Sequence, residues 1–411
     1  MRSFVKKIVR SFYLHARQAV LHGAGLVLRQ RRLRSVPDPS KITNILFIRT
    51  DRIGDMVLST AALRAIKRGF PLARLTVLAS LSNAPLLQHD PHVDEVIVWN
   101  EGGLGSSLVG FLRRAARLSK IGYDAVIDPL TGNNLHTALI AYLSGAALRI
   151  GFPGYGREVF FNRLAAYPDK YRHMADLILE TAILLGAESE DRTPQLCLLP
   201  AERDWAGGWL QAHSLGHRAV IGIHPGGYYP SQRWPLDYYA QLALALQQDH
   251  GCGVVLIGGR GDRHLIRSIL ASSGERFVVF ESSDLRKTVA VISQLNVLVC
   301  NNSGPLHIAT ALNVPTLSFM GPTEKSHWMP LGNKYEVLRQ DHLECIGCNS
   351  GTCTRGDLAC MKLIKPEEAL GCIIRLLKQE TRNRDRSLVD EYFPGRETIP
   401  IVPQTRQAII F

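Results

Sequence analysis

The sequence has no uninterrupted apolar run of about 18 residues, the length that would indicate a membrane-spanning helix. Cysteine is scarce, with eight residues among 411, which argues against a secreted fold built on disulfides. Apolar residues make up 46% and charged residues 20% of the chain, and this composition excludes wholesale disorder and a multi-span membrane protein. We therefore expect a cytoplasmic globular protein with two domains or one large one.

Acidic residues are nearly absent from residues 1–41. This segment holds ten lysines and arginines but only one acid, Asp38, so it contributes +9 to a net charge of +12. A domain that wraps nucleic acid would spread its cations over the fold, so we expect no nucleic-acid partner. Phe4, Ile8 and Phe12 recur every four residues, as in an amphipathic helix with a basic face. The clustered cations favour a tail that binds an anionic membrane surface, although a solvated helix packed on its own domain would show the same spacing.

Short apolar strands alternate with helical segments in residues 42–200 and again in residues 201–380. The first series predicts strands at 45–48, 75–79, 95–99 and 125–128, and helices near 55–67, 108–118, 135–143 and 173–185. The second series predicts strands at 219–223, 254–257, 297–300 and 316–319, and helices near 236–247, 262–270, 285–294 and 306–312. This alternation is typical of a parallel sheet covered by helices on both faces. The sequence thus predicts two doubly wound α/β domains in tandem, followed by an extended C-terminal tail at 381–411.

Glycines and polar residues follow three strands of the second domain, at the edge where sheets of this kind bind their ligands. Ser303 and Gly304 come just after the strand at 297–300. The first amides of the next helix offer a seat for a phosphate there. His307, one turn into that helix, could reach the same anion. A capped turn with a packed histidine would have the same sequence.

Two further turns of the second domain strengthen this interpretation. His224 and Gly226 follow its first strand, at a turn where the backbone can approach a ligand closely. Arg233 comes shortly afterwards and could bind a phosphate oxygen through its guanidinium. Asp262 follows the glycines after the second strand and could accept hydrogen bonds from a ribose. Together the three strand ends predict a pocket for a nucleotide diphosphate.

Two carboxylates follow the first strand of the first domain. Asp51 lies between that strand and the next helix, and Asp55 stands at the start of the helix. Their spacing places both at the mouth of the expected cleft, where Asp55 could act as general base toward a hydroxyl acceptor. A carboxylate that only caps the helix would be placed in the same way.

Three segments of the chain resemble glycosyltransferase family 9, the ADP-heptose:lipopolysaccharide heptosyltransferases. They are RTDRIGD at 49–55, HPG at 224–226 continuing to RWP at 233–235, and NSGPLH at 302–307. The segments occur in the family's order, within a stretch of roughly residues 44–380. The resemblance implies a GT-B fold, in which two Rossmann-like domains face each other across a cleft. It also implies an inverting transfer of heptose, or a related sugar, from a nucleotide diphosphate.

The resemblance implies roles for individual residues as well. Asp55 matches the base that deprotonates the acceptor hydroxyl, whereas Gly304 and His307 match the segment that holds the donor diphosphate. Gln232 stands where members often have lysine, so Arg233 would supply the cation alone. The other expected substrate-binding residues are Asp51, Arg52, His224, Gly226, Asp262, Asn302 and Ser303. A fixed cluster of hydrogen-bond donors can replace a divalent ion in this role, so we expect no essential catalytic metal.

Four cysteines lie in a glycine-rich loop at 345–360. Their positions are Cys345, Cys348, Cys353 and Cys360. Four thiolates this close together could bind zinc or iron as a structural metal, and the resemblance implies iron, which some members of family 9 bind with similar clusters. Free thiols without a ligand are an equal alternative.

These patterns predict an inverting glycosyltransferase that moves heptose, or a related sugar, from an ADP-sugar to a hydroxyl of the lipopolysaccharide core. The acceptor would lie at the inner membrane face, where the basic tail would hold the enzyme as a peripheral protein. A transferase with a protein acceptor and a non-catalytic nucleotide-sugar-binding protein are the alternatives. A dehydrogenase is disfavoured, because the first strand leads into Arg49 and Thr50 and not into a G-x-G-x-x-G turn.

Overall fold

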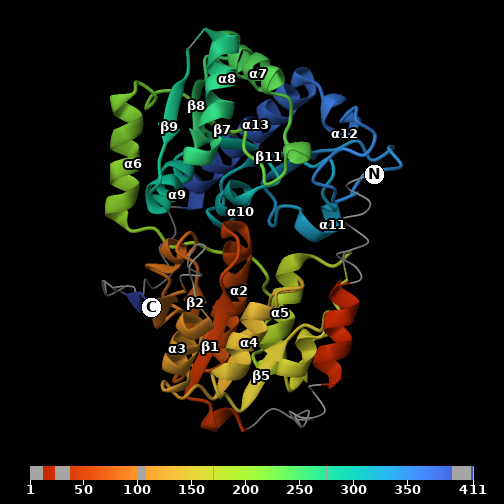
Figure 1. Ribbon diagram of the computed structural model, residues 1–411. Helices are drawn as coiled ribbons and strands as arrows, with labels where there is room; N and C mark the ends of the chain where they lie inside the picture. The colour runs from red at the N-terminus through yellow and green to blue at the C-terminus, as the bar shows by residue number, and fades with distance from the viewer. Residues whose placement is uncertain are drawn as a thin grey trace. The chain divides into compact units, whose positions relative to one another are not determined.

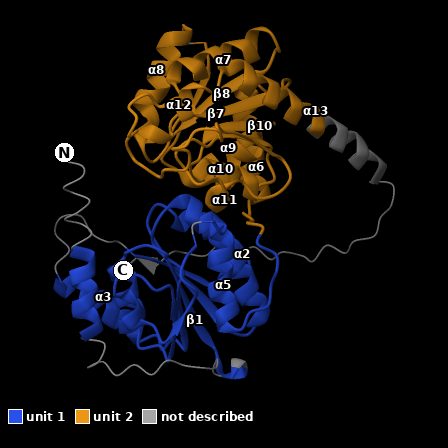
Figure 2. Cartoon of the chain, turned by 90° about the vertical axis from the view of Figure 1, so that its right-hand side faces the viewer, with its two compact units in different colours: residues 1–192, 406–411 blue, residues 193–405 orange. Residues whose placement is uncertain are grey.

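The computed structural model describes residues 13–23, 38–99, 108–169, 171–274, 276–390 and 409–410. The chain forms two compact units, the first of residues 1–192 and 406–411 and the second of residues 193–405 (Figure 2). The second unit begins at Thr193. The sequence predicts the domain boundary a few residues later, between residues 200 and 201. Arg286 of the second unit donates to the carbonyl of Cys197 at 2.8 Å, which ties the intervening segment to the second unit.

The first unit is built on a seven-stranded parallel sheet with the strand order β13-β3-β2-β1-β4-β5-β6. The strands are β1 (Asn44–Arg49), β2 (Arg74–Ala79), β3 (Glu95–Val98), β4 (Ala125–Asp128), β5 (Leu148–Gly151), β6 (Arg163–Leu164) and β13 (Ile409–Ile410). The helices are α2 (Ile53–Gly69), α3 (Leu108–Ser119), α4 (Leu135–Leu143) and α5 (Met174–Leu185), with 3-10 turns η1 (Pro39–Lys41), η2 (Ala84–Leu87) and η3 (Arg157–Phe160). Helices α3 and α4 share one core with the sheet, which includes Leu46, Val126 and Phe111, while α2 and α5 pack against each other (Figure 1).

The second unit contains a six-stranded parallel sheet with the order β12-β11-β10-β7-β8-β9. The strands are β7 (Val220–His224), β8 (Gly253–Gly258), β9 (Val278–Glu281), β10 (Val297–Asn301), β11 (Thr316–Phe319) and β12 (Tyr335–Leu338). The helices are α6 (Pro200–Ala212), α7 (Leu236–Gln248), α8 (Arg263–Ser273), α9 (Leu285–Ser293), α10 (Gly304–Ala311), α11 (Lys325–Trp328), α12 (Ala359–Lys362) and α13 (Pro366–Asp390), with 3-10 turns η4 (Pro230–Gln232) and η5 (Arg260–Asp262). Ile223, Trp234 and Leu317 belong to its core.

The predicted strands and helices are confirmed, as is the α/β fold with two doubly wound units. Central strands such as β1 and β10 are buried along nearly their whole length, so each contains an unbroken apolar run, at 45–48 and 297–300. The alternation misses β5, β6, β9 and β12. These strands are short or lie toward the sheet edges, and β12 is only half-buried at every position, so the apolar run that marks a strand is weaker there.

The C-terminal segment differs from the predicted extended tail. Helix α13 continues to Asp390, because no glycine or proline interrupts residues 372–393. Strand β13 then pairs in parallel with β3, so the end of the chain joins the sheet of the first unit. Residues 391–408 lie outside the described ranges.

Part of the predicted basic tail is a helix packed on the first unit. Residues 13–23 are helical, and Leu14 among them is buried. Arg17 donates from Nε and Nη2 to the carbonyl of Tyr155 at 3.2 and 3.1 Å, and from Nη1 to the carbonyl of Asn133 at 3.1 Å. Arg17 therefore binds the protein itself. The amphipathic spacing of the tail rests on residues outside the described ranges, namely Phe4, Ile8 and Phe12. Across the described residues, every helix is too short or too polar to cross a bilayer.

Candidate active site

Three charged side chains of the first unit meet where β1 ends. Arg49 is the last residue of β1, and its side chain is 1% exposed. Its Nε lies 3.3 Å from Asp51 Oδ1, and its Nη2 lies 3.2 Å from Asp55 Oδ1. Its Nη1 donates to the carbonyl of Pro129 at 3.4 Å. The buried guanidinium is thus held between two carboxylates, and it fixes the position of both.

Asp55 has the surroundings expected of a positioned carboxylate. It lies in the first turn of α2, next to the positive end of the helix dipole, and is 6% exposed. The contact with Arg49 reaches back to β1, so the role of Asp55 extends beyond capping its own helix. The catalytic role of Asp55 stays a prediction.

Asn83, in the loop after β2, holds the turn that carries these charges. Its amide nitrogen donates to the carbonyls of Arg49 and Asp51 at 3.0 and 3.2 Å. Its amide oxygen accepts from the backbone amide of Ser80 at 2.9 Å. The side chain is fully buried. A lone asparagine between two predicted elements forms no recognisable sequence pattern, so Asn83 is not among the predicted site residues.

A second buried ion pair supports the same edge of the sheet. Asp128 ends β4 and binds the guanidinium of Arg157, and both side chains are 0% exposed. Arg157 also donates to the carbonyls of Leu130 and Gly132. These bonds fix the loop after β4, whose Pro129 carbonyl receives a bond from Arg49. The two pairs therefore form one connected network beneath Asp55.

Burial raises the pKa of Asp51 to about 6, from an ordinary value of 3.8. The positive charge of Arg49 opposes this shift, whereas the negative charge of Asp55 adds to it. Two carboxylates that share one guanidinium in a desolvated loop repel each other when both are ionised. Asp51 therefore binds a proton in a pH range where an isolated aspartate is fully ionised.

In the second unit, the carboxyl ends of β7, β8 and β10 bring several predicted residues together. His224 Nε2 lies 3.5 Å from Asp262 Oδ2, and His224 Nδ1 lies 3.4 Å from Ser303 Oγ. A Cβ atom at Gly226 would overlap the side chains of Asp262 and His224, so only glycine fits there. Burial alone would raise the pKa of Asp262, but the contact with His224, a backbone amide bond from Gly259 and the charge of Arg233 hold it below its ordinary value.

Asn301, the last residue of β10, joins these strand ends. Its amide nitrogen donates to the carbonyls of Pro225 and Gly226 at 2.9 Å each, and its amide oxygen accepts from the backbone amide of Trp234 at 2.9 Å. The side chain is fully buried. The sequence motif points to the neighbouring Asn302, which is half-exposed, and not to Asn301, which holds the turn.

Arg233 and Trp234 have different roles in the structure. Trp234 is buried, stacks on Phe319 with ring centroids 4.2 Å apart, and donates from its indole to the carbonyl of Ile364 at 3.0 Å. Arg233 is half-buried and donates from Nε and Nη2 to the carbonyl of Gly227 at 3.2 and 3.0 Å. Because the tryptophan is anchored in the core, the guanidinium of Arg233 is held beside the glycine turn.

The remaining predicted donor residues lie at the start of α10. Ser303 is its N-cap residue and Gly304 its first residue. His307, in the first turn and a half of the helix, is 3% exposed, with its ring centroid 6.3 Å from that of Trp328. In the first unit, Arg52 is exposed next to the N-terminus of α2.

The four cysteines of the 345–360 loop are free thiols. Three backbone amides of the loop outweigh burial and hold the pKa of Cys353 below its ordinary value. Burial, together with the charges of the other three cysteines, raises the pKa of Cys360 to about 11. Throughout the described part of the chain, no three Cys, His, Asp or Glu side chains are arranged to hold a metal ion. The arrangement of these side chains therefore gives no support to the predicted zinc or iron. Metal binding by the loop stays a prediction.

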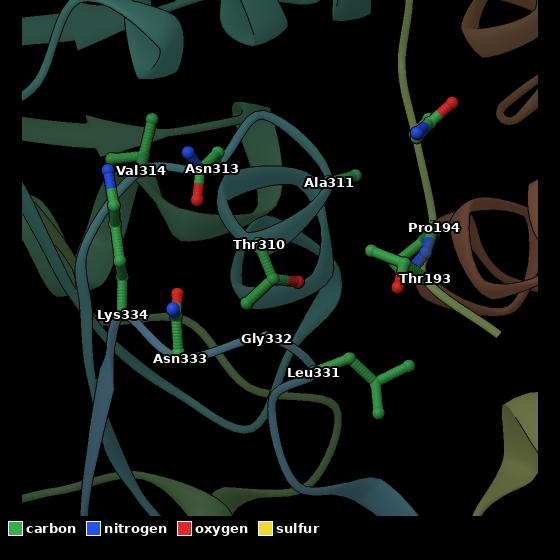
Figure 3. A pocket seen from close by; sticks show the side chains of 11 residues that line it. Thr193, Pro194, Thr310, Ala311, Asn313, Val314, Leu331, Gly332, Asn333 and Lys334 are labelled. Carbon is green, nitrogen blue, oxygen red and sulfur yellow. The ribbon is translucent and has the colours of Figure 1, made fainter. Parts of the chain in front are cut away.

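A cavity of about 180 Å³ lies elsewhere in the second unit (Figure 3). Thr310 and Ala311 at the far end of α10 line it, together with Lys334 just before β12 and residues 193–195. It thus lies near the amino ends of β11 and β12, at the opposite end of the strands from Gly304. None of the predicted donor-binding residues lines it, so this cavity is separate from the candidate site.

Known proteins are similar to this chain in sequence and in fold. The model of glycosyltransferase family 9 (heptosyltransferase) matches residues 111–359. Lipooligosaccharide heptosyltransferase 2 of Haemophilus influenzae is 30% identical over 348 residues, which cover 81% of this chain and 99% of that protein. Lipopolysaccharide heptosyltransferase 2 of Escherichia coli is 29% identical over 311 residues, covering 72% and 87%. The solved structure of ADP-heptose lipopolysaccharide heptosyltransferase II of E. coli superimposes with a TM-score of 0.68 at 26% identity, covering 82% of this chain and all of that one.

Two doubly wound units with polar strand ends, together with these matches, define a glycosyltransferase of the GT-B fold. The chain belongs to glycosyltransferase family 9. The resemblance seen in the three motifs is therefore confirmed. The chain is therefore an enzyme that transfers a sugar. The alternative hypotheses, a dehydrogenase and a non-catalytic nucleotide-sugar-binding protein, are set aside.

We predict that Asn301→Ala lowers the free energy of unfolding by about 2–3 kcal/mol, because it removes three hydrogen bonds and leaves buried backbone groups unpaired. Asn302→Ala is the matched control, since its half-exposed side chain should contribute little to stability. Urea denaturation of both variants makes the comparison. Equal losses in the two variants would show that Asn301 does not hold the turn.

We also predict that the stability difference between Asp51→Asn and the wild type depends on pH. A carboxyl with a raised pKa contributes stability that is present below its ordinary pKa and lost as the pH rises through about 6. The asparagine variant lacks this loss. Its free energy of unfolding should therefore rise relative to the wild type between about pH 4.5 and about pH 7.5. A constant difference across this range, measured by urea denaturation, would contradict the raised pKa.

Proposed function

We propose that this protein transfers heptose from an ADP-linked donor to a hydroxyl of the lipopolysaccharide core. The two relatives described above are heptosyltransferases of lipooligosaccharide and lipopolysaccharide, and the solved structure described with them is an ADP-heptose enzyme. The observation that carries the proposal is the cluster of buried Arg49 and Asp55 with half-buried Asp51, in which Asp55 is positioned to act as a base.

Asp55 would accept the proton of the acceptor hydroxyl as its oxygen attacks the anomeric carbon. The new bond to the acceptor oxygen forms while the bond from that carbon to the diphosphate oxygen breaks, and ADP leaves with the electron pair. Attack from the face opposite the diphosphate inverts the anomeric centre. The carboxylate of Asp55 is held in position for this step by a bond from Arg49 Nη2 at 3.2 Å.

The second unit would bind the donor. The guanidinium of Arg233, the first amides of α10 and His307 are the groups that could neutralise charge developing on the departing diphosphate. Asp262 and His224, which contact each other at the ends of β7 and β8, offer a carboxylate and a ring nitrogen to the ribose hydroxyls. We assign Gly226 the role of leaving room for this pair beside the ligand.

We propose further that the enzyme works in the cytoplasm, at the inner face of the membrane. The acceptor core is attached to a lipid, so the reaction has to take place at a membrane surface. The excess of cations in residues 1–41 supports an attraction to anionic lipid.

Asp55→Asn tests the catalytic role. We expect turnover to fall by about 10²–10⁴-fold, because the acceptor hydroxyl loses its base. ADP should still raise the melting temperature as it does in the wild type, since the donor-binding residues belong to the other unit. Glu190→Gln, an exposed carboxylate of the first unit, is the matched control. The assay uses ADP-heptose with lipid A–core or a protein acceptor. Full activity of Asp55→Asn would remove the proposed base, and transfer to the protein alone would redirect the acceptor assignment.

We propose that no divalent ion is needed for the transfer, because Arg233, His307 and helix amides can stabilise the leaving group. Activity should therefore persist in excess EDTA, whereas complete loss that only a divalent ion restores would reject the proposal. Metal analysis of the purified protein tests the cysteine loop separately. One equivalent of zinc or iron would support a structural metal, and less than one equivalent of any transition metal would remove it.

A further inference from the structure

Helix α3 exposes an unusual number of large apolar side chains for a surface helix. Leu108, Val109 and Leu112 are 70, 54 and 45% exposed. The opposite side of the helix is firmly packed, since Phe111 and Leu118 are buried in the core that α3 shares with α4 and the sheet. Among the helices of the described residues, α3 alone exposes three large aliphatic side chains within about one turn.

The packing fixes which way α3 faces. The ring of Phe111 lies edge-on to Trp99 with centroids 5.9 Å apart, and it lies 4.7 Å from the ring of His136 on α4. The guanidinium of Arg114 lies over the ring of Trp99 at 5.2 Å. With these contacts on its inner side, the helix cannot turn its exposed leucines inward without breaking its own core.

The exposed face of α3 also carries positive charge. Arg113 and Arg117 on the helix are exposed, and so is Lys120, which directly follows it. No aspartate or glutamate occurs between residues 102 and 123. Side chains three or four residues apart share a helix face, so Leu108 and Leu112 form one exposed row. Val109, Arg113 and Arg117 form the row beside it.

We propose that this outer face of α3, together with Lys120 and Ile121, lies on the surface of an anionic membrane. An interfacial helix needs aliphatic side chains that enter the boundary of the acyl chains and cations that meet the lipid headgroups. α3 offers both on one side and carries no acid that would repel the surface. The complementary charge favours an anionic lipid surface over an apolar protein partner, which would supply no negative charge to the basic side chains of this face.

This inference deepens the proposed membrane location and rests on that part of the proposed function. It assigns membrane contact to helix α3 of the first unit, in addition to the basic residues of the segment 1–41. The site of sugar transfer is not involved, because none of the α3 residues belongs to the cluster around Arg49. Membrane binding and transfer can therefore be measured independently.

The test is sedimentation of the full chain with vesicles of phosphatidylcholine alone or of an equal mixture with phosphatidylglycerol. We expect the wild type to bind the mixed vesicles and to be released by salt. The L108Q/L112Q and R113Q/R117Q variants should each bind the mixed vesicles about tenfold more weakly. Ile183→Gln, which removes an equally exposed aliphatic side chain from α5, should bind like the wild type.

Three outcomes would overturn the proposal. The wild type could fail to bind the mixed vesicles, the α3 variants could bind them as the wild type does, or Ile183→Gln could weaken binding equally. Self-association of the wild type that both α3 variants abolish would instead make this face an interface between copies. Circular dichroism and melting temperature check that each variant is folded. Transfer to a lipid-free core oligosaccharide should be unchanged in the α3 variants. Failure of the wild type to transfer heptose to both this oligosaccharide and lipid A–core would sink the proposed function without affecting the membrane result.

Discussion

An arginine buried at the end of a central strand has to be paired with carboxylates, and this requirement organises the first unit. The side chain of Arg49 is almost completely removed from water, where an unpaired guanidinium would be very costly. Asp51 and Asp55 supply the counter-charges, and Asn83 fixes the backbone between them. The contacts that neutralise the buried guanidinium also hold the carboxylate of Asp55 in one position. Stability and the proposed chemistry thus rest on one set of bonds.

The second unit reaches a similar result without a buried ion pair at its centre. Asn301 ends the central strand β10 and uses its neutral amide to bind two carbonyls of one turn and the backbone amide of Trp234. A neutral clamp leaves the charged groups, Arg233 and Asp262, partly exposed at the edge of the sheet. Because these groups are not buried in ion pairs of the core, they can bind a ligand, and Arg233 can bind an anion. The two units therefore divide the expected tasks, with a fixed base in one and anion-binding groups in the other.

Much of the fold could be predicted, because central parallel strands are buried on both faces and have to be apolar. β1, β4, β7 and β10 were visible for this reason. Edge strands such as β12 and the pairing of the C-terminal strand β13 with β3 could not be predicted, because they depend on contacts with strands that are distant in sequence. In the candidate site, the glycine turns and Asp55 were visible as local motifs. Asn83 and Asn301 were not, since their role consists of bonds to residues far along the chain.

By itself, the sequence determined the order of strands and helices, the glycine turns and the membership in one enzyme family, because each is written in local pattern or spacing. Only the tertiary structure decided which polar residues are buried together. It paired Arg157 with Asp128, placed Arg49 between two carboxylates and turned Arg17 toward its own domain. It also left the leucines of α3 in solvent. The physical reason is that burial and charge pairing depend on distance in space, and a sequence records only distance along the chain.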